Sequence, residues 1–263
     1  MGAATLLSFS SLVSAGPIFL TGHDPDFHTQ AGAGQTLLQT GLDYATGGQT
    51  SNTAKKFLWV ESRISTPGGH LTGESSLGIL GLTLGTHYDR ANGSELAGVD
   101  FSIYEAIAIA SSFGGKLTRA ELDALIARSA DIKNFINAGG GLFASSECYP
   151  CGANLLGGAT PPALFGYLPI IVTSIGANPP FNVTPFGASL GLSNGDVNDP
   201  THNSFGMTGG LNVVDTDAAG NATTLAGNVR INGGGFTPVP EPASFGLMGL
   251  GLVAMSWLRR RMV

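Results

Sequence analysis

The most regular hydrophobic pattern lies in the middle of the chain. Residues 104–110 are almost all apolar, which is typical of a strand buried on both faces of a sheet. A helix is predicted next, with Thr118 as its N-cap, Glu121 as the capping-box partner, and apolar residues mostly three or four positions apart. It ends at the C-cap signal of residues 137–139, and an apolar strand begins at Gly140. Strand, helix and strand within this length predict a βαβ unit with parallel strands and a right-handed crossover.

Shorter apolar runs, separated by glycine-rich stretches, predict the remaining elements. Together they indicate an α/β fold, with a doubly wound, mostly parallel sheet followed by a C-terminal β-hairpin. The predicted elements are, in chain order, a strand at 18–20, a helix at 29–46, a strand at 55–62, a helix at 75–84, a strand at 168–173, and hairpin strands at 211–215 and 222–226 with a turn at 217–221.

The last part of the chain combines a rigid Pro240-Glu241-Pro242, an apolar run and the block Arg259-Arg260-Arg261. Residues 243–258 predict a single hydrophobic helix of about 24 Å, which is shorter than the roughly 20 residues of a usual membrane span. Snorkelling arginines and local bilayer thinning can cover the difference. Arginines directly after the span predict a cytoplasmic C-terminus. The alternative, an amphipathic core helix, would have to end in three adjacent charges without acidic partners.

These three parts, in this order, resemble the PEP-CTERM sorting signal of Gram-negative, exopolysaccharide-producing bacteria. In that family the tail is inserted into the inner membrane, and an exosortase processes the protein near Pro-Glu-Pro. The resemblance implies an exported protein that passes through the inner membrane to the cell surface or the extracellular matrix. We therefore divide the chain into a signal peptide at 1–15, an α/β domain at 16–232, a flexible linker at 233–238 and a sorting tail at 239–263.

The N-terminus agrees with export. Residues 6–13 contain a short apolar segment, and Val13-Ser14-Ala15 before Gly16 is similar to an A-x-A cleavage site. The usual basic region is missing, so the alternative is a buried first strand. A signal peptide is favoured because a C-terminal sorting signal has a use only on an exported protein.

Composition argues against a nucleic-acid partner. Charged residues make up 11% of the chain, less than half of the usual ~25%. The net charge is −6, and three of the twelve basic residues lie in the tail, so no basic face remains for a nucleic acid. Low charge with abundant glycine fits an exported surface protein.

The loop after the first strand is a candidate ligand-binding loop. His23, Asp24, Asp26 and His28 follow the apolar run at 18–20, and ligands of open α/β sheets bind at the carboxyl ends of the strands. These side chains could perform proton chemistry, and His23 with Asp24 could bind a metal. The alternative is that the aspartates shape a turn and cap the next helix.

The βαβ segment is similar to class I glutamine amidotransferase-like and ThuA-like domains of the flavodoxin type. The matching parts are residues 104–110, Ala138-Gly139-Gly140-Gly141-Leu142 and residues 143–147. The resemblance implies a flavodoxin-like sheet and a sharp elbow after the last of these strands. Ser145 or Ser146 stands where that family has a cysteine nucleophile, and the flanking glycines are missing, so glutamine hydrolysis is not implied here.

The same resemblance points to three candidate catalytic residues. Ser146 and Glu147 occupy the elbow, and the catalytic histidine of amidotransferase-like folds lies late in the chain, where His202 stands. The alternative is that His202 and Asn203 bond to backbone groups of their own loop.

Cys148 and Cys151 are the only cysteines of the chain. In an exported protein they favour a small structural disulfide that fixes the loop after the strand. The alternatives are a thioredoxin-type redox pair or reduced thiols. A metal site would need further cysteine or histidine residues at matched spacing.

Two main functions stay open. The first is an exported, non-catalytic protein whose α/β domain binds a ligand or a partner, such as exopolysaccharide or another surface protein. The second is a hydrolase or transferase that uses Ser146 or Glu147 with His202, with a metal held by His23 and Asp24. No cofactor is evident. A redox role of Cys148 and Cys151 is a third hypothesis. We favour the first function because of the sorting signals, the low charge and the missing nucleophile.

Overall fold

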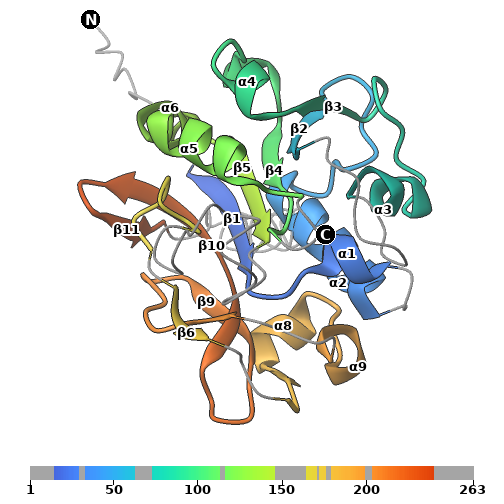
Figure 1. Cartoon of the computed structure of the whole chain (residues 1–263). Helices are drawn as coiled ribbons and strands as arrows, with labels where there is room; N and C mark the ends of the chain where they lie inside the picture. Colours follow the sequence, from blue (N-terminus) through green and yellow to red (C-terminus); the bar gives the residue numbers. More distant parts are fainter. Residues whose placement is uncertain are drawn as a thin grey trace, which may run out of the picture.

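The computed structural model describes residues 15–29, 33–62, 73–112, 116–145, 164–170, 172–175, 179–198 and 203–239 (Figure 1). Its centre is a block of five parallel strands, in the order β3-β2-β4-β5-β1. The bounds of these strands are Gly16–Thr21 for β1, Phe57–Val60 for β2, Tyr88–Ala91 for β3, Ala106–Ile109 for β4 and Gly141–Ser145 for β5.

Antiparallel strands continue the sheet on the far side of β1. The long strand β10 pairs with β1 over six residues and also with β8, β9 and β11, while β6 pairs with β8 and β7 with β9. The first strand therefore joins the parallel block to the antiparallel part. The bounds are Val172–Ile175 for β6, Asn182–Val183 for β7, Asn203–Phe205 for β8, Asn212–Thr216 for β9, Ala222–Asn232 for β10 and Gly235–Pro238 for β11.

Helices cover both faces of the sheet, as a doubly wound fold requires. Ile18 and Leu20 of β1 belong to the core under α5 and α6, whereas Phe19 belongs to the core under α2 and α3 (Figure 1). The alternation follows from the period of two along a strand. The helix bounds are Pro25–His28 for α1, Ala33–Ala45 for α2, Gly73–Ile79 for α3, Gly93–Leu96 for α4, Phe101–Ile103 for the 3₁₀ turn η2, Arg119–Ala127 for α5, Ser129–Asn137 for α6, Pro185–Ser189 for α8 and Asn194–Val197 for α9.

The predicted βαβ unit is confirmed as β4, α5, α6 and β5, with β4 and β5 parallel. Thr118 and Glu121 form the predicted capping box. The single helix expected there is divided at Arg128, whose backbone leaves the helical region. The guanidinium of Arg128 donates hydrogen bonds to the carbonyls of Leu96 and Val99, so the break joins this helix pair to the loop after α4.

The order of the parallel strands corrects the flavodoxin-like prediction. In the flavodoxin order the first strand lies inside the parallel block, whereas β1 lies at its end, between β5 and β10. The physical reason is the full-length antiparallel pairing with β10, from Gly16↔Val229 to Thr21↔Thr224.

The linker expected at 233–238 is also corrected. The hairpin of β9 and β10 is confirmed, but the chain then turns at Gly233 and pairs again as β11 with β10. Phe236 packs on the core, which gives this short strand an apolar anchor. The strand expected at 168–173 begins only at Val172.

Residues 1–14 of the predicted signal peptide and the predicted apolar helix at 243–258 lie outside the described residues. Within the described ranges, no helix is both long and apolar enough to cross a bilayer.

Candidate functional site

The loop after β1 buries His23, Asp24 and Asp26 at the C-terminal edge of the parallel strands, whereas His28 is partly exposed. His23 Nε2 lies 2.9 Å from Asp215 Oδ2, and both side chains are fully buried. Thr223 donates its hydroxyl to the same carboxylate oxygen. The ring of Phe181 meets the His23 imidazole edge-on, with 5.1 Å between the ring centroids. These contacts connect the exit of β1 to β9 and β10.

The register of β1 and β10 positions this pair. Thr21 and Thr224 are opposite each other, and their hydroxyls lie 2.9 Å apart. The backbone amide of His23 donates to Thr21 Oγ1 at 3.1 Å, which turns the chain sharply after the strand.

The second half of the loop forms α1, which Pro25 starts at a position where its missing N–H costs nothing. Asp24 Oδ2 and His28 Nε2 lie 3.3 Å apart across this turn of helix. Asp26 is fully buried, and its Oδ2 accepts the backbone amide of Ser111, directly beyond β4, at 3.0 Å. Ser76 of α3 donates its hydroxyl to the carbonyl of Asp26.

Two more buried ionisable residues lie at the same edge. Glu61 follows β2, accepts the indole N–H of Trp59 at 2.8 Å and lies 3.5 Å from Arg90. Lys116 is 1% exposed, and its carbonyl accepts the amide of Ser62. The exits of β1, β2 and β4 therefore bring two carboxyls and an amine together.

Burial controls the protonation of this group. It raises the pKa of Asp26 and of Glu61, while hydrogen bonds from Ser111 and Trp59 and the charge of Lys116 oppose the rise. Burial also lowers the pKa of Lys116, against the attraction of Glu61 and Asp26. A buried group of carboxyls and an amine with shifted pKa values can form charge-assisted hydrogen bonds with a polar ligand.

Three of the four residues of the predicted ligand loop are thus buried, and His23 and Asp24 have different ionisable neighbours. His23 Nε2 lies beside Asp215 Oδ2, whereas Asp24 Oδ2 lies 3.3 Å from His28 Nε2. The described residues contain no group of three or more histidine, cysteine, aspartate or glutamate side chains that could hold a metal ion.

The other predicted site residues, Ser146, Glu147, Cys148, Cys151 and His202, lie outside the described residues. Their described neighbours are informative. Ser145 is in register with Thr21, and Asn203 is so close to Gly22 that a Cβ on that glycine would lie 2.0 Å from the Asn203 carbonyl oxygen. Ser145 and Asn203 therefore both lie next to the exit of β1.

The sequence analysis did not predict Asp215, Glu61 and Lys116 as site residues. Asp215 and Glu61 each follow apolar strand residues, and a carboxylate in that position is the signal that could have identified them. Lys116 lies in a polar stretch between two elements, and nothing around it in the sequence indicates burial.

Comparison with known proteins identifies a sorting motif in the tail. A family model for the PEP-CTERM protein-sorting motif matches residues 238–261, which include Pro240-Glu241-Pro242 and Arg259-Arg260-Arg261. No curated protein and no solved structure matches the chain. The motif indicates an exported protein that an exosortase sorts to the cell surface or the extracellular space, whereas the amidotransferase-like resemblance gains no support.

Proposed function

We propose that this chain is an exported surface or matrix protein whose α/β domain binds a small polar ligand, without catalysis, at the C-terminal edge of its parallel strands. The sorting motif at 238–261 supports the destination, reached through the inner membrane. Exopolysaccharide or another surface protein is the proposed partner outside the cell.

One observation carries the ligand-binding proposal. At this edge, Asp26 Oδ1 and Ser145 Oγ are shielded from solvent and have no hydrogen-bond partner among the described residues. A buried polar atom without a partner costs about 1–3 kcal/mol. A polar ligand that bonds to both atoms would recover this free energy, and open α/β sheets bind their ligands at this edge.

The destination is tested by the intact mass of the protein recovered from the envelope and the medium of its own host. We expect a species that starts at Gly16, ends near Pro240 and is two hydrogens lighter because Cys148 and Cys151 are joined. A Glu241→Ala variant should keep its tail. A full-length wild-type species with free thiols would disprove both the sorting and the disulfide.

The ligand is tested by native mass spectrometry of the same material. We expect a non-covalent adduct on the wild-type protein that is at least tenfold weaker in Asp26→Asn and Ser145→Ala. The matched control is Asp123→Asn, an exposed aspartate of α5 that pairs with Arg119. Wild-type protein without any adduct, or variants that retain it, would contradict the proposal.

A hydrolase is the second candidate, and the buried His23–Asp215 pair favours it. An aspartate bonded to a histidine orients the imidazole as a general base, and Ser145 and Asn203, the described neighbours of Ser146 and His202 in the chain, lie next to the exit of β1. A fluorophosphonate probe should then label Ser146, and both Ser146→Ala and Asp215→Asn should abolish labelling. Unlabelled wild-type protein, together with no turnover of p-nitrophenyl acetate, excludes the serine hydrolase.

A further inference from the structure

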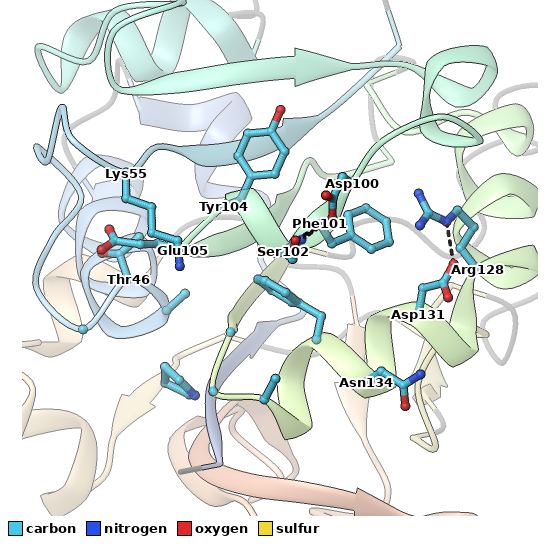
Figure 2. A pocket seen from close by; sticks show the side chains of 17 residues that line it. Thr46, Lys55, Asp100, Phe101, Ser102, Tyr104, Glu105, Arg128, Asp131 and Asn134 are labelled. Carbon is cyan, nitrogen blue, oxygen red and sulfur yellow. Dashed lines mark hydrogen bonds and ion pairs between the residues drawn. The ribbon is translucent and has the colours of Figure 1, made fainter. Parts of the chain in front are cut away.

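A hollow of about 620 Å³ opens at the N-terminal ends of the parallel strands (Figure 2). Pro17 of β1, Glu105 directly before β4 and Gly140 directly before β5 line it. The volume lies within the roughly 300–1,000 Å³ of small-molecule sites. Because the strands are parallel, this edge is opposite to the one that holds His23, and the hollow is independent of the function proposed above.

The wall of the hollow already holds an internal cation. The guanidinium of Arg128 lies over the ring of Phe101, 4.0 Å from its centroid, and Nε donates to Asp131 at 2.9 Å (Figure 2). Its Nη1 donates to the carbonyl of Leu96 at 2.7 Å and to that of Val99. Ring face, carboxylate and carbonyl oxygens are the groups that bind guanidinium and ammonium ions.

Negative charge remains after Arg128 is satisfied. The lining also contains Asp100 and Glu105, against the exposed ammonium of Lys55. Hydrogen bonds from Ser102 lower the pKa of Asp100, so this carboxylate stays ionised at ordinary pH. Burial raises the pKa of Glu105, while the charge of Lys55 and a hydrogen bond from Asn52 oppose the rise. Its Oε2 has no hydrogen-bond partner among the described residues.

Two helices add to this potential. Ala45, the last residue of α2, and Ala138, directly after α6, both line the hollow. The C-terminal end of a helix carries a partial negative charge that attracts cations. Carboxylates, helix C-termini and aromatic rings therefore all favour the binding of a cation in the hollow.

We propose that this hollow is a binding site for an organic cation, a guanidinium or ammonium group on a short carbon body. The carboxylates of Glu105 and Asp100 attract the cationic head, and the carbon body packs on Tyr104 and Phe135, which also line the hollow. The site requires no residue of the loop after β1.

Isothermal titration calorimetry of the full chain with matched probes tests this site. Butylguanidinium and butylammonium carry the charge, butylurea is the neutral analogue, and butyrate is the anion. We expect both cations to bind at least tenfold more tightly than butylurea, butyrate not to bind, and the cation affinity to fall with added salt. Equal binding of cation and urea, or no binding of either cation, would overturn the proposal.

Variants locate the site. Glu105→Gln and Asp100→Asn should each weaken butylguanidinium binding at least fivefold, whereas Asp123→Asn on the exposed face of α5 should leave it unchanged. Asn caps η2 as well as Asp does, so Asp100→Asn provides a folded variant even if Glu105→Gln lowers stability. Unchanged affinity in both hollow variants would place the binding elsewhere and refute the assignment.

Discussion

At the scale of single residues, the loop after β1 depends on the lack of a side chain at Gly22. Gly22 donates its amide to the carbonyl of Thr223 at 2.7 Å, and the carbonyl of Asn203 occupies the space of a side chain on its other side. The loop is therefore held between β8 and β10. Any larger residue at position 22 would separate these strands from β1.

Gly22→Ala should lower the free energy of unfolding by about 2 kcal/mol or more, since the new Cβ would lie 2.0 Å from Asn203 O. The matched control is Gly78→Ala in α3, where a Cβ meets nothing within 4 Å and should stabilise the helix by roughly 0.5–1 kcal/mol. Urea unfolding measures both. Equal midpoints for the two variants would show that Asn203 does not clamp the loop.

The buried carboxyl of Asp26 predicts a specific pH dependence. Its pKa is raised above the ordinary 3.8, so the folded state holds a proton that the unfolded state has lost. This contribution to stability is complete below about pH 4 and is lost as pH rises through the folded-state pKa. Glu61 acts in the same direction, and the charge of Lys116 limits both shifts.

Asp26→Asn removes this titration and keeps an acceptor for the Ser111 amide. Relative to wild type, the variant should gain stability between pH 4 and pH 7, by about 1.4 kcal/mol for each unit by which the native pKa is raised. Urea unfolding at several pH values measures the difference. The exposed Asp123→Asn should change stability by less than about 1 kcal/mol at each pH. A difference between Asp26→Asn and wild type that does not vary with pH would refute the raised pKa.

At the scale of elements, Glu121 joins two helices. Its Oε2 accepts the amide of Thr118 at 3.0 Å, and its Oε1 accepts the amide of Gly93, the first residue of α4, at 2.8 Å. The side chain is buried, so both bonds are shielded from water. The capping box therefore also fixes the start of a helix 28 residues earlier in the chain.

Glu121→Ala should be more destabilising than Thr118→Ala. Loss of the cap costs roughly 1 kcal/mol, and the Glu121 variant also leaves the Gly93 amide without its acceptor, at a further cost of about 1–3 kcal/mol. Arg119→Ala, which removes only the exposed pair with Asp123, should cost about 0.3–0.5 kcal/mol. Chemical denaturation of the three variants gives the order, and a milder effect of Glu121→Ala would contradict this account.

The elements that the sequence predicted are those with local signals. β1, β4, the capping box of α5 and the hairpin of β9 and β10 are recognisable from period, caps and turns within a few residues. The place of β1 between β5 and β10 and the pairing of β11 depend on partners elsewhere in the chain. No local pattern encodes such partners, which explains why the flavodoxin-like order and the linker were wrong.

At the scale of the whole molecule, the two sites differ in how far the sequence could predict them. The loop after β1 was predicted because its side chains are adjacent in sequence and follow a buried strand. The partner of His23 lies 192 residues away in β9, and the hollow collects residues from Pro17 to Gly140. Such sites exist only after the sheet has assembled.

The pairing of β11 predicts where the folded domain ends. Truncation after Val239, which keeps the bond from the Val239 amide to the Asn228 carbonyl, should leave the free energy of unfolding unchanged. Truncation after Asn232 removes β11 and uncovers the surface under Phe236, which should cost about 1–2 kcal/mol. Urea midpoints of both truncations measure this difference. Equal midpoints would show that residues 233–238 are a linker that does not stabilise the domain.

The position of β11 has a mechanical consequence, because the sorting motif begins at its last residue, Pro238. A pull on the tail, away from β10, reaches the Val239–Asn228 bond first and then the pairs from Val229↔Pro238 to Asn232↔Gly235. The bonds would break one after another, at low force. Each freed residue adds roughly 3.3 Å of extension, while β10 stays held by β1 and β9. The pairing of β11 with β10 would thus break first, and the rest of the sheet would be protected from the applied force.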